Sequence, residues 1–241
     1  MKRMIVMAAS VLLALSLAMP VAFGQVGTGS KAPGASQKLV TAWWKWALAN
    51  HVAGNPLFGG DPDYSARQCD GAPLNNKLDD WWFLAGTLDQ RKVVRTCTMP
   101  DDKRLFFPAF NTVIIATEPS DTEASMLAQA HHFIRAVRDS RGFKMVVKVD
   151  GKVVPNKNIV RAESPLFSGK SLLLSDLGFG NGKKPYSYQA VADGRWVRVP
   201  ALSEGKHKIH WEISAPNADT DPATAGKEGF FQNITYRLRV R

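Results

Sequence analysis

Two neighbouring carboxylates, Asp79 and Asp80, stand directly before the aromatic stretch Trp81–Phe83. Hydrolysis of a glycosidic bond needs two carboxyl groups at a set separation, one of them with a raised pKa. An acidic pair beside aromatic rings is therefore the best-placed set for acid–base chemistry on a sugar polymer, with His51 or His131 as a further proton carrier. No converging set of residues is visible around the pair. Asp79 and Asp80 are thus weak catalytic candidates, and no catalytic residue is assigned.

The histidines do not predict a metal site, and no cofactor is expected. His207 and His210 have an H-x-x-H spacing, but side chains three residues apart on a strand point to opposite faces. His131 and His132 are adjacent on a predicted helix, about 100° apart around its axis. Neither pair is therefore well placed to coordinate a single metal ion.

The first 24 residues have the three parts of a secretory signal peptide. Lys2 and Arg3 precede an apolar run that continues to residue 21, and small residues stand before a predicted cut at Gln25. An uncleaved anchor is the alternative, because the apolar run approaches the ~20 residues that span a bilayer. Pro20 near the end of the run favours cleavage. We expect a secreted or periplasmic protein with no transmembrane segment after cleavage.

The two cysteines, Cys69 and Cys97, are expected to form a disulfide. An exported chain meets an oxidising compartment, where paired cysteines usually become bonded. A redox motif would place them two residues apart, and a zinc site would need further ligands at short spacing. The bond would tie the Gly- and Pro-rich loop 54–76 to a strand, which predicts an ordered loop.

The chain is basic, with a formal net charge of +10, or +8 without Lys2 and Arg3. Such a charge favours acidic partners, although by itself it bears mainly on solubility and non-specific association. No block of five or six like charges resembles a nucleic-acid-binding arm. We therefore expect a polysaccharide, an anionic polymer or a protein as partner, and no nucleic acid.

Aromatic and basic side chains supply the expected ligand-binding residues. Trp43 and Trp44 are predicted to anchor a helix at 37–50 on the core, which leaves Trp46 freer to stack on a sugar. The other expected binding residues are Trp81, Trp82, Tyr64 in the loop, and Arg237 and Arg239 on the outward face of the last strand. Rings and cations at loop edges suit stacking and charge pairing with polysaccharide.

Most of the chain is predicted to be β-structure. Alternating or β-branched runs predict strands at 81–87, 92–99, 104–115, 195–199, 207–214 and 230–241. The pair Asp150-Gly151 predicts a type I′ hairpin within 143–155. A second helix is predicted over 120–138, where Ser120 and Glu123 could form a capping box.

These elements predict a mainly β fold, an antiparallel β-sandwich of jelly-roll-like type with two inserted or peripheral α-helices. The expected organisation is a signal peptide at 1–24, a flexible tail at 25–37 and a single domain at 38–241.

The order of motifs resembles a family of secreted, functionally uncharacterised proteins, mainly bacterial. The residues that carry this resemblance are Trp44 and Trp46, Asn55-Pro56, Cys69, Trp82–Gly86, Arg95, Cys97, Pro100, Phe106–Pro108, Asn111, Gly205, His207, Ile209 and Thr235–Val240. They span most of the chain after residue 24. The resemblance implies secretion, one disulfide and a β-rich domain, and it implies no reaction. Residues 71–82 depart from the pattern, since relatives look rich in glycine and glutamine there.

Two functions from different classes remain. The first is a secreted or periplasmic binding or interaction module, with a polysaccharide or an anionic envelope polymer favoured as ligand. The alternative is a hydrolase or lyase that acts on an envelope or host polymer through Asp79 or Asp80 and a histidine. Binding is favoured because it needs only a surface, whereas catalysis needs residues that converge.

Overall fold

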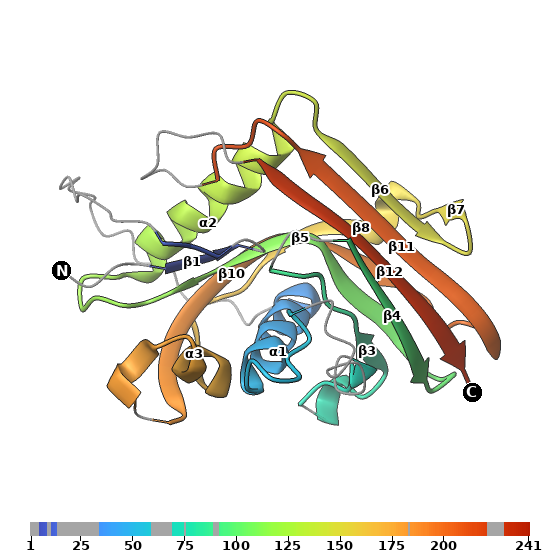
Figure 1. Cartoon of the computed structure of the whole chain (residues 1–241), viewed down its shortest axis with the longest axis horizontal. Helices are drawn as coiled ribbons and strands as arrows, with labels where there is room; N and C mark the ends of the chain where they lie inside the picture. The colour runs from blue at the N-terminus through green and yellow to red at the C-terminus, as the bar shows by residue number, and fades with distance from the viewer. Residues whose placement is uncertain are drawn as a thin grey trace.

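The computed structural model describes residues 5–8, 11–13, 34–58, 69–74, 76–88, 92–182, 184–220 and 229–241. They form a β-sandwich of two sheets with three α-helices, and strands make up 42% of the structure. One helical pair, α1 (Ala35–Ala49) and α3 (Leu172–Asp176), lies on the opposite side of the larger sheet from α2 (Glu123–Arg138) (Figure 1). No helix among the described residues is long and apolar enough to cross a membrane.

The larger sheet has the strand order β2-β1-β5-β10-β8, and β3 and β9 add to it beside β5 and β10. Its strands are β1 (Ile5–Ala8), β2 (Val11–Leu13), β3 (Trp81–Phe83), β5 (Arg104–Ile115), β8 (Ile159–Glu163), β9 (Phe167–Ser171) and β10 (Tyr186–Val199). The two first strands lie inside the predicted signal peptide, and β1 pairs with Thr112–Ile115 of β5. The spine of this sheet is the long antiparallel pair β5–β10.

The smaller sheet has the order β4-β12-β11-β6-β7. Its strands are β4 (Lys92–Met99), β6 (Lys144–Val149), β7 (Lys152–Val153), β11 (Gly205–Ala215) and β12 (Phe230–Val240). Short 3₁₀ turns η3 (Asn76–Leu78), η4 (Asn156–Asn158) and η5 (Phe179–Gly182) complete the elements. In Figure 1 this sheet leans against the face of the larger sheet that also carries α2.

Two hydrophobic cores hold the layers together. The first fills the space between the two sheets with residues such as Phe107, Trp211 and Tyr236. The second lies between the larger sheet and α1, where Trp43 and Trp196 pack edge to face at 5.4 Å. Burial of large aromatic rings on both faces explains why β5 is buried along nearly its whole length.

The mainly β sandwich is confirmed, with one change of detail. Both sheets are mixed, because β3 runs parallel to β5 and β4 runs parallel to β12. Although the predicted strands at 81–87 and 92–99 follow each other in the chain, β3 and β4 belong to different sheets. Local alternation identified the strands but could not identify their partners. The strand order does not establish a jelly-roll.

The predictions that rest on a few adjacent residues, such as turns and helix ends, agree better with the structure than any inference about which strands pair. At the predicted hairpin, Asp150 and Gly151 both have positive φ, at 50° and 79°, and join β6 to β7. The N-cap of the second helix lies two residues later than expected, because Thr122 rather than Ser120 accepts the hydrogen bond from Ser125 N. Glu123 instead accepts a hydrogen bond from Leu166 N.

Candidate functional site

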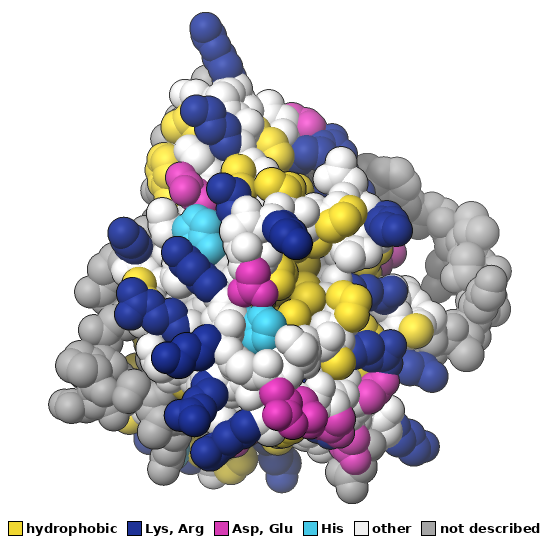
Figure 2. Space-filling model, turned by 90° about the vertical axis from the view of Figure 1, so that its right-hand side faces the viewer, with side chains coloured by type: hydrophobic (Ala, Val, Ile, Leu, Met, Phe, Trp, Pro, Cys, Tyr) yellow, Lys and Arg dark blue, Asp and Glu magenta, His cyan; other side chains and the backbone are white. Residues whose placement is uncertain are grey.

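The outer surface of the smaller sheet carries a cluster of cations, which we call the basic face. It consists of Lys144, Lys148, Lys206, Lys208, Arg237 and Arg239. They come from three neighbouring strands, and their inward neighbours, such as Ile209 and Leu238, are buried in the core. Figure 2 shows dark blue Lys and Arg side chains spread over this side of the molecule. The alternation of β12 thus places the predicted Arg237 and Arg239 on an exposed surface.

Like charges face each other across β11 and β12. Lys206 is registered directly opposite Arg239, and Lys208 directly opposite Arg237. Like charges at directly opposed positions destabilise a sheet. No ion pair joins any residue of the basic face to a carboxylate within the described part of the chain. The sheet therefore tolerates a repulsion that an external anion would relieve.

Hydroxyl and apolar groups border the basic face. Thr96 and Thr98 of β4 lie beside Arg237 and Arg239 in the register. Val94 and Val146 are exposed on the same side. The face can thus offer cations, hydrogen-bonding hydroxyls and some apolar surface to an extended ligand, but the indole rings lie elsewhere.

A hydrogen-bonded pair, His207 and Asp150, lies where β11 meets the turn between β6 and β7. His207 Nδ1 lies 2.7 Å from Asp150 Oδ2, and His207 Nε2 lies 2.8 Å from the Ser203 carbonyl oxygen. The bond to Asp150 raises the pKa of His207 above its usual value, against a smaller opposing effect of burial. Burial works to raise the pKa of Asp150, but hydrogen bonds from Lys208 N and His207 lower it. This pair fixes the tight turn between β6 and β7 onto β11.

The predicted aromatic platform is not formed as expected. Trp46 is slightly less buried than Trp43 and Trp44, but at 3% exposure, with its Nε1 donating a hydrogen bond to the Asp70 carbonyl at 2.7 Å, its ring is not open to stack on a sugar as expected. The loop that carries Asp70 thus lies against the side of α1 that presents Trp46. Trp43 and Trp44 are buried as predicted.

Trp81 and Trp82 are half-buried rather than open to a ligand. The guanidinium of Arg104 lies over the Trp81 ring, 4.2 Å from its centroid. Trp82 packs against the core between the sheets. Tyr64, the remaining aromatic candidate, lies outside the described residues. Neither tryptophan joins Arg237 and Arg239 on the basic face.

The weak catalytic candidates are not brought together with a histidine. Asp80 forms an ion pair with Arg104, and both side chains are about half exposed. Asp79 is exposed. The nearest carboxylate partners of the two candidate histidines are elsewhere: His51 Nδ1 is 2.8 Å from Asp176 Oδ2, and His131 Nε2 is 2.7 Å from Glu163 Oε2. Among the described residues, neither Asp79 nor Asp80 is therefore bonded to His51 or His131.

A buried arginine organises many of the motif residues. Arg95, only 4% exposed, donates hydrogen bonds to the carbonyl oxygens of Pro56, Ala85 and Gly86 and to the Tyr236 hydroxyl, at 2.6–3.0 Å. Its guanidinium also lies 5.2 Å from the centre of the Tyr236 ring. These contacts join β4, β12 and two loops. The motif at this position therefore has a structural explanation.

The predicted disulfide is confirmed. Cys69 and Cys97 are bonded, with their Cα atoms 5.2 Å apart. Cys97 lies on the inward side of β4 and is buried, whereas Cys69 follows the undescribed part of the loop. The bond holds the loop end that also receives the Trp46 hydrogen bond.

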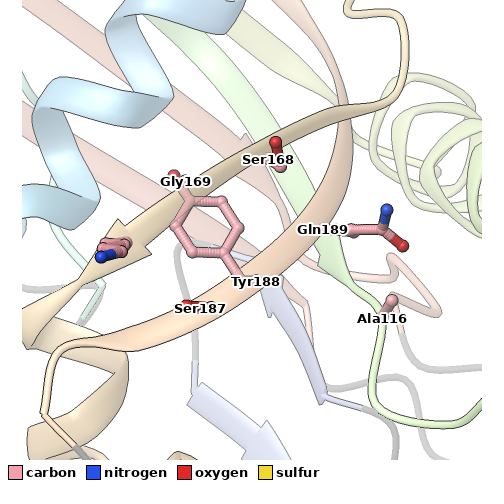
Figure 3. Close-up of a pocket in the computed structure, with 7 residues that line it drawn as sticks. Ala116, Ser168, Gly169, Ser187, Tyr188 and Gln189 are labelled. Carbon is pink, nitrogen blue, oxygen red and sulfur yellow. The ribbon is translucent and has the colours of Figure 1, made fainter.

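A shallow surface depression of about 580 Å³ lies over β9 and β10. It is lined by Ala116, Ser168, Gly169, Lys170, Ser187, Tyr188 and Gln189. Figure 3 shows the Tyr188 ring lying against Gly169, whereas the Gln189 side chain points away from it toward Ala116. A Cβ at Gly169 would come within 2.6 Å of the Tyr188 hydroxyl, and burial raises the pKa of that hydroxyl. The depression lacks a group of converging charges.

Sequence reasoning missed a charged cluster between α2 and the larger sheet. His131, Glu163 and Asp193 bring ligand atoms within 4.8 Å of one another. Asp193 is fully buried, and Arg161 Nη2 binds its Oδ2 at 2.7 Å, which raises the pKa of Arg161. The three ligand types suit a metal, but the bound guanidinium already satisfies the carboxylate and would repel a cation. A charged Asp193 among the apolar residues of a strand was the available signal.

Comparisons with known proteins do not assign a family. No protein-family model matches the chain, and no curated protein matches it. Among solved structures, it is similar to the solution structure of amebosin, at 10% identity and a TM-score of 0.19, over 66% of this chain and 96% of that one. It is also similar to AggA, the major subunit of aggregative adherence fimbriae type I from Escherichia coli, at 12% identity and a TM-score of 0.18. That match covers 61% of this chain and 89% of AggA. These likenesses are too distant to carry an argument.

Proposed function

We propose that the protein is a secreted or periplasmic binding module whose basic face binds an anionic polymer of the cell envelope, with an acidic polysaccharide favoured. The observation that carries this proposal is the pair of directly opposed like charges, Lys206 with Arg239 and Lys208 with Arg237. Four cations held on adjacent strands form a grid of about 5 Å by 7 Å. A chain of regularly spaced anionic groups can neutralise several of them at once.

Charge pairing, rather than stacking on tryptophan, is the mode of binding in this proposal. Trp46 is buried, and Arg104 covers Trp81. The basic face contributes lysine and arginine tips that stay hydrated, so each contact with an anion is weak and sensitive to salt. Affinity must therefore come from many contacts along a polymer. The signal peptide remains part of the proposal, and the disulfide is consistent with an oxidising compartment.

The test is binding of alginate, an acidic polysaccharide, to the mature protein, measured by calorimetry at about 50 mM and 200 mM NaCl, where screening differs strongly. Neutral dextran serves as the uncharged polymer. We expect alginate alone to bind, with an affinity that falls as salt rises. The double variant K206Q/R239Q should bind about tenfold more weakly at low salt, which corresponds to about 1.4 kcal/mol.

A matched control is available on α1. The double variant K38Q/K45Q removes the same charge from two exposed lysines far along the chain from the basic face. Equal weakening in both double variants would mean that net charge alone drives binding and would reject the assigned face. Shortening of the alginate during the assay would instead support the alternative, a hydrolase or lyase.

A further inference from the structure

A second cavity, of about 300 Å³, lies between the end of α2, the strand β6 and the larger sheet. Its apolar lining comes from Phe110, Phe143, Met145 and Ile159. Its polar lining comes from Arg138, Asn156 and Arg195. The volume lies at the lower end of the range of roughly 300–1,000 Å³ for small-molecule sites. The lining thus combines an apolar wall with two guanidinium groups.

Two arginines, Arg138 and Arg195, line this cavity, and a third, Arg161, is registered opposite Arg195; Arg138 and Arg161 each already have a carboxylate partner. Arg138 makes two hydrogen bonds to Asp139, at 2.6 Å and 2.7 Å. Arg161 is bonded to the buried Asp193. For Arg195, which is half-buried, the described residues provide neither a side-chain hydrogen bond nor an ion pair. Arg195 is therefore a cation partly removed from water without a counter-charge.

The sheet places Arg195 in an unfavourable electrostatic position. Arg161 of β8 is registered directly opposite Arg195 of β10, and like charges in this arrangement repel. Phe110 is the opposite residue on the other side, in β5, and the register of β5 and β10 shifts immediately afterwards, between Arg195 and Trp196. Such irregularities re-aim side chains and are frequent beside functional sites. A bound anion would relieve the repulsion between the two guanidiniums.

We propose that this cavity binds a small organic anion, with a carboxylate or phosphate head at Arg195 and an apolar body against Phe110, Phe143 and Met145. A planar guanidinium binds two oxygens of either head group at once. The T-shaped pair of Phe110 and Phe143, with ring centroids 5.9 Å apart, offers ring faces and edges to an apolar body. The site lies between α2, β6 and the larger sheet, whereas the basic face lies on the outer surface of the smaller sheet. It therefore does not depend on polymer binding.

The experiment uses 3-phenylpropionate as the probe, with 3-phenylpropionamide as its uncharged counterpart and phenyl phosphate as the alternative head group. Binding is followed by NMR of the labelled methyl groups of Met145 and Ile159, which line the cavity. We expect one of the two anions to shift both methyl signals in a saturable manner, and the amide to leave them unchanged. The stronger anion identifies the head group.

Three variants that each lower the net charge by one make the assignment specific. R195Q should weaken binding about tenfold, because it removes the charged hydrogen-bond donor. N156D changes an exposed lining residue that is easily tolerated, and should weaken binding by placing a negative charge at the cavity. R141Q removes an exposed arginine just beyond α2 and should bind the probe as the unchanged protein does.

Several results would overturn the proposal. These are methyl signals that respond to no anion, an amide that binds as well as the carboxylate, or N156D and R141Q that bind equally. If R195Q fails to fold, the comparison of N156D with R141Q still decides, since both changes lie at exposed positions. Loss of alginate binding by the basic-face variant, with probe binding intact, would separate the two sites.

Discussion

At the scale of single residues, the protein contains cations in three different environments. Arg95 is buried and hydrogen-bonded to three carbonyl oxygens, Arg195 is half-buried without a described partner, and Arg237 is exposed beside another cation. The first arrangement stabilises the fold, because the two terminal nitrogens of the guanidinium donate hydrogen bonds to buried backbone oxygens. The other two leave charge unneutralised, and both of our binding proposals rest on them.

The variant Arg95→Met should be markedly destabilised. It leaves the buried carbonyl oxygens of Pro56, Ala85 and Gly86 without this donor, which we expect to lower the free energy of unfolding by about 3 kcal/mol. Urea denaturation measures the change. Arg104→Met, at an exposed arginine of β5, is the control and should cost about 1 kcal/mol or less. Equal losses in the two variants would contradict the structural role of Arg95.

His207 should make stability depend on pH. Its folded pKa is raised from 6.5, so its contribution is complete below about pH 6.5 and is lost as pH rises through the folded value. The folded pKa of Asp150 is lowered from 3.8, so its contribution is present above about pH 3.8 and is lost as pH falls through the folded value. The pair should therefore stabilise most between about pH 4 and 6.5.

Urea denaturation of His207→Gln across pH 3 to 9 tests this expectation. The variant should lose stability relative to the unchanged protein mainly within that window, and the difference should narrow toward higher pH. His132→Gln provides the control, since His132 Nε2 contacts only the backbone oxygen of Asp219 among the bonds described. A difference that does not vary with pH would show that the pair acts through packing alone.

At the scale of elements, β10 and α2 do the most to assemble charged side chains. One face of β10 carries Asp193 and Arg195, and β8 brings Arg161 and Glu163 opposite them. The helix adds His131 to the same cluster. Because this face of β10 is covered, the Asp193 carboxylate is buried, and burial of a charge costs free energy. A charge-assisted hydrogen bond from Arg161 offsets that cost. The cavity at Arg195 exists because α2 ends beside it.

The disulfide acts on a loop that has few other described anchors. The double variant C69A/C97A should lower the free energy of unfolding by about 3 kcal/mol, because the bond restricts a loop of 28 residues in the unfolded chain. Thermal denaturation with and without a reducing agent measures the effect. The reducing agent should destabilise the unchanged protein and leave the variant as it was. Identical stability of the two proteins would show that the loop is held by its other contacts.

At the scale of the whole molecule, the large aromatic side chains lie between the layers, whereas many of the cations lie on the outside of the smaller sheet. Tryptophan and phenylalanine side chains hold α1 to the larger sheet and the two sheets to each other. The outward surface of the smaller sheet carries lysine, arginine and threonine together with His210, Glu212 and two exposed valines, and cations are numerous on the side shown in Figure 2. A net charge of +10 is thus concentrated in part on one flat surface. Such a surface attracts extended anions over about a Debye length, roughly 10 Å at 0.1 M salt.

The sequence by itself determined what depends on neighbouring residues. Alternation along 230–241 predicted that Arg237 and Arg239 face outward, and Asp150-Gly151 predicted the hairpin, because both follow from the local geometry of a strand and a turn. The two cysteines could pair only with each other. The mainly β class followed from the number of such local signals.

Only the tertiary structure decided which distant segments meet. The partners of β3 and β4, the burial of Trp46 under the Asp70 loop, and the meeting of His131, Glu163 and Asp193 all join residues that are far apart in sequence. These contacts depend on the packing of whole sheets and helices, which local periodicity does not encode. The cavity at Arg195 belongs to the same group, since its wall comes from α2, β5, β6, β8 and β10 together. Strand identity is a property of a few adjacent residues, whereas a site requires the relative placement of several elements.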